Sequence, residues 1–430
     1  MARSIRSWHD ALAVAKKPLT DKDVLCLGHL KRAFVLLDRL HWVGCERDSA
    51  GNRELHFDDY CKLALLYIWN PLILSVHDLQ EAMGLPRVAK ALGVKRFSAG
   101  SFSESVRVFD PEQLKPIIQE LAGQLVPYPA DPRLGELKHV LTLVDGTVLA
   151  ALARLARAAC SDTRQATRYN TSRDGNAVHA WKLHTQFDLQ TFSPHRLDRT
   201  GAHNAGELRE SNVLRRSLEA GRCYVGDGGY ADRSLFDDIL SAQSSYVIRA
   251  AENSVFELVQ ERLLSQEALD AGIVRDALVR LEGAQHGVRR VEVQVKPHPR
   301  RKRTGTKQTD LIILSTSLLD LPPEPIALIY RQRYTVELFF RVFKQLLGMR
   351  HLLSQREEGI DIQIYCTVIV CILIQLISGK KPNKAMRNMV GWYLLGLADE
   401  QDVINFLNKP DNTGVKLRAK EALWKKLGVN

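Results

Sequence analysis

The sequence predicts an α/β protein in which a helical N-terminal domain precedes a core of strands and helices. Three observations support this prediction. Residues 1–130 carry apolar side chains at helical spacing, whereas residues 138–251 hold short apolar or alternating runs that are typical of strands. Residues 252–322 are again rich in strand-like runs, and residues 349–430 look helical. A proline-rich segment at 127–133 is expected to link the first two parts.

The N-terminal part contains several expected helices. One is expected over 58–69, and Ser75 is expected to cap the next, which ends at Gly84. The run LPRVAKALGV forms another short helix, so this pair has the outline of a helix-turn-helix, although many plain helical pairs look the same. DNA recognition by the pair and a purely structural role both stay open. A further capped helix is expected over 110–125.

The elements after the linker come in the order strand, strand, strand, helix, strand, helix, strand. The expected strands are HVLTLVDGTVL, AWKLHTQFDL, HRLDRTGA, CYVGD and SYVIRAA, and the expected helices cover 205–220 and 233–242. This is the element order of a ribonuclease H-like domain. In such a domain the first and fourth strands are neighbours.

A β-rich insertion over 252–322 interrupts this core before a long helix, expected over 325–347, completes it. Within the insertion, VRRVEVQVK and TDLIILSTS are expected to pair. The loop between them could follow a DNA backbone or form a solvated hairpin tip. It contains the basic run Arg300, Arg301, Lys302 and Arg303.

The chain is basic, with 60 Lys and Arg against 49 Asp and Glu, a formal charge of +11 and a pI near 9.3. An excess of this kind favours a polyanionic partner without identifying it. The seven cysteines are odd in number and form no C-x-x-C pair, which indicates a reducing compartment such as the cytoplasm. The most apolar stretch, 364–377, is too short to span a bilayer comfortably, so a buried helix and no membrane association are expected.

Two aspartates are candidates for an active site because each is expected where an apolar strand meets glycine. Asp145 lies in LTLVDGT and Asp227 in CYVGDGGY. An Asp at a strand end points into the crevice of an α/β sheet, where ligands bind, although a turn-forming Asp-Gly looks the same. On neighbouring strands, and with Glu337 brought by the long helix, the three carboxylates would repel one another without cations. Their oxygen ligands suit Mg²⁺ or Mn²⁺.

The helix that carries Glu337 presents one polar face. At 100° per residue, its polar side chains share an arc of roughly 80°, opposite an apolar stripe. That arc contains Tyr330, Arg333, Glu337, Arg341 and Lys344. A solvated face with an Arg333–Glu337 ion pair would account for the pattern. The functional alternative is a metal-binding carboxylate flanked by groups that hold phosphates.

These motifs resemble the DDE transposases of bacterial insertion sequences, of the insertion-sequence-four type. Tyr330, Arg333, Glu337 and Lys344 match the family's Tyr-x2-Arg-x3-Glu-x6-Lys spacing without a gap. VDGT and GDGGY resemble its two aspartate motifs, with Gly228 where a basic residue is common. The resemblance covers the whole chain. It implies DNA-end binding by 1–130, a split ribonuclease H-like core (138–251 and the catalytic helix 323–348) and dimerisation through 349–430.

The resemblance also implies the chemistry and the partners. Two Mg²⁺ ions, with Mn²⁺ as a substitute, would activate the nucleophile and stabilise the departing 3′ oxygen, with Asp145 bridging both ions and Asp227 and Glu337 each completing one site. Phosphates would be held by Tyr330, Arg333, Lys344 and Arg341. The DNA partners would be terminal inverted repeats and target DNA, bound by a homodimer at the nucleoid. A nuclease that cuts without joining, and an inactive DNA-binding relative, are the alternatives.

Some relatives release their element through a DNA hairpin and capture a flipped base on an aromatic residue of the insertion. No Trp lies between Asp227 and Glu337. The substitutes that remain are Phe236, Tyr246, Phe256, His286 and His298. Lys182 and His184 alternate with apolar neighbours on the second strand and are expected to face the same side of the sheet. They could touch DNA if that is the metal side, although a lone histidine on a strand is more often structural.

Overall fold

The computed structural model describes most of the chain, which divides into two compact units. The first unit comprises 1–125, 346–354 and 358–430, and the second comprises 126–345 and 355–357. The described residues are 33–45, 53–70, 72–129, 131–150, 180–201, 208–251, 254–283, 285–295, 310–348, 353–354, 356–383, 385–386, 388–389, 392 and 397–408.

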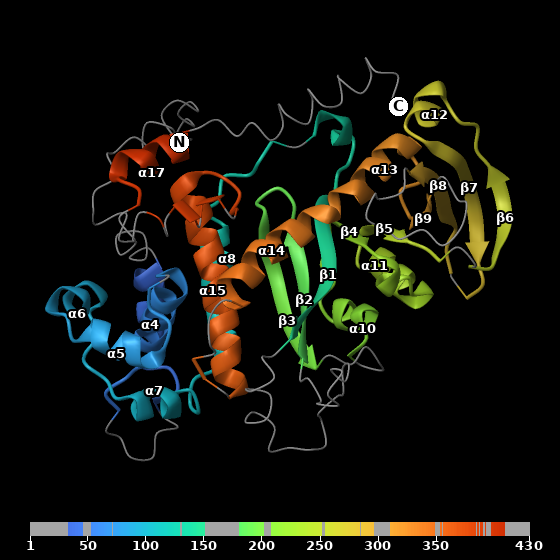
Figure 1. Cartoon of the computed structure of the whole chain (residues 1–430). Helices are drawn as coiled ribbons and strands as arrows, with labels where there is room; N and C mark the ends of the chain where they lie inside the picture. Colours follow the sequence, from blue (N-terminus) through green and yellow to red (C-terminus); the bar gives the residue numbers. More distant parts are fainter. Residues whose placement is uncertain are drawn as a thin grey trace, which may run out of the picture. The chain divides into compact units, whose positions relative to one another are not determined.

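The second unit is built on one mixed sheet, in which the described residues form nine strands (Figure 1). Their order across the sheet is β3-β2-β1-β4-β5-β9-β8-β7-β6. The strands are β1 (Val140–Ala150), β2 (Ala180–Asp188), β3 (Ser193–Gly201), β4 (Arg222–Gly226), β5 (Ser245–Arg249), β6 (Phe256–Glu261), β7 (Ile273–Leu281), β8 (Val288–Val295) and β9 (Asp310–Thr316).

The pairing of these strands brings together the two that hold the aspartate motifs. β1 pairs with β4 in parallel, and β4 pairs with β5 in parallel, whereas β2 and β3 are antiparallel to their neighbours. The predicted adjacency of the first and fourth strands is therefore confirmed. β8 and β9 pair antiparallel, as the sequence predicts. β5 also pairs with β9, so the strands of the insertion continue the same sheet.

Short helices cover the sheet of this unit. Two of them, α10 (Glu210–Arg215) and α11 (Arg233–Ser241), share a buried core with strands β1, β4 and β5. That core includes Val144, Leu214, Tyr224, Phe236, Ile239, Tyr246 and Ile248. The other helical elements are η4 (Pro132–Leu134), η6 (Gly228–Tyr230), α12 (Gln266–Asp270), α13 (Pro323–Gln332) and α14 (Tyr334–Gly348).

Three expectations about this unit differ from the structure. The helix predicted over 205–220 is observed, among the described residues, only as α10. The single long helix predicted over 325–347 is two helices, α13 and α14, which are separated at Arg333. There the backbone forms i→i+3 bonds, Arg333 N–H to Tyr330 O and Val336 N–H to Arg333 O, which tighten the turn. Asp145 does not end its strand, because β1 continues to Ala150 along β2.

The first unit is helical in its described part. Ser75 caps α5 by accepting a hydrogen bond from the Asp78 N–H at 3.1 Å, and Gly84 ends that helix, both as predicted. The helix predicted over 110–125 begins as a 3-10 turn and ends at Ala122. The elements are η1 (Asp38–Leu40), α4 (Phe57–Trp69), α5 (Val76–Met83), α6 (Pro86–Leu92), α7 (Ala99–Ser105), η3 (Pro111–Gln113), α8 (Leu114–Ala122), α15 (Glu357–Ser378) and α17 (Glu400–Asn408).

Helix α15 contains the most apolar stretch of the sequence. By length and composition alone it could cross a membrane, but 83% of its most apolar window is buried inside the protein. Ile364, Ile369 and Leu373 are among the side chains with almost no exposed surface. The prediction of a buried helix over 364–377 is therefore confirmed.

Candidate active site

The sheet topology determines where the three predicted carboxylates lie. β1 pairs with β4 only as far as Leu143, so Asp145 lies just beyond this pairing, opposite Thr185 of β2. Asp227 directly follows β4 and caps η6, where its Oδ1 accepts a hydrogen bond from the Gly229 N–H at 2.9 Å. Glu337 lies in the first turn of α14. Asp145 and Asp227 thus lie at the point where the parallel strands β1 and β4 separate.

The carboxyl group of Asp145 is influenced by the other acidic groups of this region. Burial, together with the negative charges of Asp227, Glu210 and Glu337, raises the pKa of Asp145 to about 6, while the charge of Arg333 opposes this rise. Charges act strongly on one another only over a few ångströms inside a protein. These carboxylates therefore form one electrostatic group.

Arg333, at the junction of α13 and α14, is a cation close to two of these carboxylates. Its Nη2 donates a hydrogen bond to Glu337 Oε1 at 2.7 Å, and its Nη1 lies 4.0 Å from Asp145 Oδ1. The ion pair within the helix that the sequence suggests is thus present, and the same guanidinium also approaches β1. Burial raises the pKa of Tyr330, while the charges of Arg333 and Arg249 oppose that rise. Tyr330 therefore belongs to the same region.

The remaining predicted phosphate-binding residues differ in their surroundings. Burial lowers the pKa of Lys344, and the charge of Asp145 acts against that shift, so Lys344 lies on the Asp145 side of α14. Arg341 is exposed and donates a hydrogen bond to the Tyr334 hydroxyl at 3.0 Å. The basic run from Arg300 to Arg303 lies outside the described residues.

Two further residues adjoin the carboxylates: Glu210, which the sequence does not single out, and Lys182, which is expected to touch DNA if it faces the metal side. Glu210, at the start of α10, forms an ion pair with Lys182 of β2, with 2.7 Å between Oε1 and Nζ. Both side chains are about nine-tenths buried. Lys182 also contributes to lowering the pKa of His184 to about 4, after the larger effect of burial, in keeping with the predicted common side of the strand. The sequence around Glu210, ELRESN, is that of an ordinary solvated helix and contains no signal for this position.

The glycines that follow the two aspartates are explained by Glu210. A Cβ added at Gly146 would lie 2.1 Å from Glu210 Oε1 and 2.5 Å from Lys182 Cε. One added at Gly229 would lie 2.1 Å from Glu210 Oε2 and 3.1 Å from Asp227 Oδ1. Each oxygen of the Glu210 carboxylate thus occupies the space that a side chain at one of these glycines would need. The carboxylate lies between the two Asp-Gly segments.

A pair of alanine substitutions in the GDGGY motif tests this packing. Gly229→Ala is expected to cost about 1–3 kcal/mol of folding stability, because the methyl group must displace the buried Glu210 carboxylate. The adjacent Gly228→Ala should change stability by less than about 0.5 kcal/mol, because the Arg249 carbonyl, 3.8 Å away, is its nearest neighbour. Thermal unfolding of both variants measures the difference. Equal midpoints would contradict the packing.

The match to known families covers this region of the chain. The family described as "Transposase DDE domain" matches residues 136–373, which include both aspartate motifs and the helix of Glu337. The chain belongs to the DDE transposase family. It is 25% identical over 206 residues to "Putative transposase y4zB" of Sinorhizobium fredii, which covers 48% of this chain and 55% of that protein. This chain thus spans about half the length of that relative.

A second relative is named after an insertion sequence. The chain is 33% identical over 69 residues to "Putative transposase for insertion sequence element IS4SA" of Synechocystis, which covers 16% of this chain and 20% of that protein. Together with the family match, this agrees with the insertion-sequence-four resemblance of the motifs around Asp145, Asp227 and Glu337.

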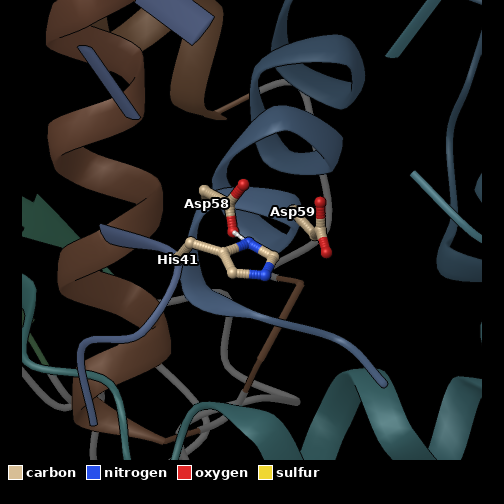
Figure 2. A group of neighbouring side chains, drawn as sticks. All are labelled: His41, Asp58 and Asp59. Carbon is tan, nitrogen blue, oxygen red and sulfur yellow. Dashed lines mark hydrogen bonds and ion pairs between the residues drawn. The ribbon is translucent and has the colours of Figure 1, made fainter. Parts of the chain in front are cut away.

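The helical unit of the chain contains another group of candidate metal ligands. Ligand atoms of His41, Asp58 and Asp59 lie within 4.8 Å of one another, and Figure 2 shows the three side chains gathered at the start of α4. However, Asp58 already has a partner on each oxygen, with His41 Nδ1 at 2.9 Å and Lys62 Nζ at 2.8 Å. Lys62 also lies 2.9 Å from Asp38. The buried ammonium supplies the positive charge here, so the group is an ion-pair network that ties α4 to η1.

The aromatic candidates for base capture in this member of the family are largely part of its core. Phe236 and Tyr246 are buried and stack on each other with ring centroids 4.3 Å apart. The Tyr246 hydroxyl is 3.0 Å from His286 Nε2. Phe256 is partly buried, with the Arg290 guanidinium 4.5 Å from its ring centroid. His298 lies outside the described residues. The buried pair cannot receive a base without unpacking the core.

Proposed function

We propose that this chain is a transposase that cuts DNA at the ends of its element and joins the cut ends to target DNA. The observation that carries the proposal is the electrostatic grouping of Asp145 with Asp227 and Glu337, at the edge where β1 and β4 separate. The strand order β3-β2-β1-β4-β5, with β1, β4 and β5 parallel, supports a ribonuclease H-like core. Membership of the DDE transposase family supports the same activity.

The residues of this group suit divalent metal ions. All the acidic ligands offer carboxylate oxygens, which Mg²⁺ and Mn²⁺ prefer. The pKa of Asp145 is raised to about 6 by burial and by neighbouring carboxylates, even with Arg333 nearby, so the region favours additional positive charge. We infer that Asp145, Asp227 and Glu337 hold two Mg²⁺ ions, for which Mn²⁺ can substitute. When bound, such ions supply an activated oxygen nucleophile and neutralise charge on the departing 3′ oxygen.

The cations beside the carboxylates would position the DNA. A guanidinium can hold a phosphate through two parallel hydrogen bonds, and Arg333 is kept in place by Glu337 at 2.7 Å. Lys344 would add a point charge on the same side, and Tyr330 a hydroxyl donor. Arg341 could reach a phosphate after releasing the Tyr334 hydroxyl. These contacts would orient the scissile phosphate without reading its sequence.

The partners follow from this activity. We propose that the protein binds terminal inverted repeats and target DNA as double strands, acts as a homodimer through 349–430, and works in the bacterial cytoplasm at the nucleoid. Residues 1–130 would bind the DNA end, and the pair α5 and α6 keeps the outline of a helix-turn-helix. The basic run from Arg300 to Arg303 would follow the DNA backbone.

A joining assay tests the proposed function. Short inverted repeats in the DNA that flanks the coding region supply the end sequence. A duplex carrying this end, already cut, is incubated with the protein, Mg²⁺ and a supercoiled plasmid. Covalent joining of the end to the plasmid is expected. Cleavage of an uncut end without joining would favour a nuclease, and binding without cutting would favour an inactive relative.

A further inference from the structure

A fourth carboxylate lies beside the proposed metal ligands, on an element that none of the family's acidic motifs includes. Glu210 is 8% exposed, and its carboxylate has one oxygen against the Gly146 backbone and the other against the Gly229 backbone. Glu210 Oε2 lies 2.1 Å, and Asp227 Oδ1 3.1 Å, from the position that a Cβ at Gly229 would occupy. The two carboxylate oxygens are therefore close neighbours. A single carboxylate thus contacts the segments that carry two different ligands.

The position of Glu210 is determined from two directions. Lys182 on β2 forms an ion pair with Oε1 at 2.7 Å, and at this burial the pair is poorly screened by water. The next residue, Ser211, donates a hydrogen bond from its hydroxyl to Asp232 Oδ2 at 3.2 Å. Asp232 in turn caps α11 through the Ser234 and Leu235 N–H groups. The start of α10 is therefore attached both to β2 and to the segment that follows Asp227.

The burial of Tyr230 gives an independent indication of the same arrangement. Burial raises the pKa of its hydroxyl well above the ordinary value, and the charges of Glu210, Asp145 and Asp227 raise it further. One buried phenol is thus close enough to all three carboxylates to be influenced by each. Glu210 belongs to the same small volume as the two aspartates.

We propose that Glu210, held by Lys182, is a positioning residue that sets the separation of Asp145 and Asp227 by filling the space between Gly146 and Gly229. Without this carboxylate the two Asp-Gly segments would lose their common contact, and the two ligands would no longer be held at one spacing. Metal ions demand ligands at nearly constant distance, so a spacing error weakens binding. This role rests on the proposed function, because it presumes that Asp145 and Asp227 bind the ions.

Measurements of Mn²⁺ binding to the full-length protein separate the effect of the volume of the Glu210 side chain from the effect of its charge. Replacing Lys182 together with Glu210 avoids leaving an unpaired buried ammonium beside the ions. Glu210→Ala with Lys182→Met removes both the ion pair and the carboxylate that fills the space between Gly146 and Gly229, and should weaken Mn²⁺ binding about 10- to 100-fold. Glu210→Gln with Lys182→Met removes the charges but keeps the volume, and should bind Mn²⁺ within about threefold of the wild type. Calorimetry, or the electron paramagnetic resonance signal of free Mn²⁺, gives the affinities.

Matched variants exclude a general loss of folding. Asp276→Asn breaks an even more deeply buried ion pair, with Arg289 at 2.7 Å, on strands of the insertion, and should leave Mn²⁺ affinity unchanged. Gly229→Ala keeps both charges but displaces the carboxylate, and should weaken Mn²⁺ binding. Wild-type affinity in both Glu210→Ala/Lys182→Met and Gly229→Ala would overturn the positioning role. Asp145→Asn reports separately on the metal site, since undiminished Mn²⁺ binding by that variant would refute the proposed function itself.

Discussion

Replacing Asp145 with asparagine is expected to lower DNA-end cleavage by more than about 1,000-fold, because the interactions of divalent ions with the transition state contribute several kcal/mol. Asparagine has the shape of the aspartate but lacks its charge, so the surrounding packing is kept. Binding of the DNA end should change by less than about twofold, since binding depends on phosphate contacts elsewhere. Cleavage of a labelled end in Mg²⁺ and a gel-shift titration in Ca²⁺ measure the two effects.

An acid-to-amide change away from the carboxylates provides the control. Glu257→Gln alters an exposed carboxylate of β6 that pairs with Arg280 at 3.3 Å. It should cleave at the wild-type rate. Wild-type cleavage by Asp145→Asn, or equal loss of cleavage in both variants, would contradict the role of Asp145.

The same substitution is expected to stabilise the metal-free protein at neutral pH. The pKa of Asp145 is raised in the folded protein to about 6, from its ordinary value of 3.8. The folded state therefore binds a proton more tightly than the unfolded state, so stability falls as the pH rises between these two values. Above pH 6 the loss amounts to about 2–3 kcal/mol, which corresponds to roughly 5–10 °C in the unfolding midpoint. Asp145→Asn avoids this loss.

The comparison is made by thermal unfolding of both proteins in a chelator, from pH 4 to pH 7.5. The midpoints should coincide near pH 4, and that of Asp145→Asn should become the higher one above pH 6. Addition of Mg²⁺ should raise the wild-type midpoint, because the ions bind only the folded site, and should raise that of the variant much less. A constant difference in midpoint across the pH range would contradict the raised pKa of Asp145. An equal response of both proteins to Mg²⁺ would contradict the role of Asp145 as a metal ligand.

Much of the fold is predictable from local sequence patterns. The apolar runs around CYVG and LTLV predict β4 and β1, and Ser75 with Gly84 predicts the bounds of α5. The break at Arg333 is not predictable, because no glycine or proline marks it and the irregularity is in the hydrogen bonding of one turn. The run HVLTLVDGTVL predicts the extent of β1 to within one residue, but Asp145, which is expected at the strand end, lies inside the strand. Its Asp-Gly pair resembles a turn, but pairing with β2 continues through it to Ala150.

The residues of the candidate site also divide into those that local sequence spacing predicts and those that it does not. Glu337 and Arg333 can be assigned to one face from their spacing within a helix, and their contact at 2.7 Å follows from that spacing. Glu210 cannot be assigned, because its neighbours in the chain are those of a solvated helix. Its carboxylate is buried between segments far from it in the chain, and its ion-pair partner Lys182 lies on a strand of the sheet.

The element order, the two aspartate motifs and the polar face that contains Glu337 can be predicted from the sequence alone, because each depends on residues a few positions apart. The tertiary structure was needed to show that Asp227 and Glu337 influence Asp145, that Arg333 approaches Asp145, and that Glu210 fills the space beside Gly146 and Gly229. Spacing along one helix or strand determines which side chains share a face. Contacts between elements depend on how the whole sheet pairs and packs, and no local pattern encodes that.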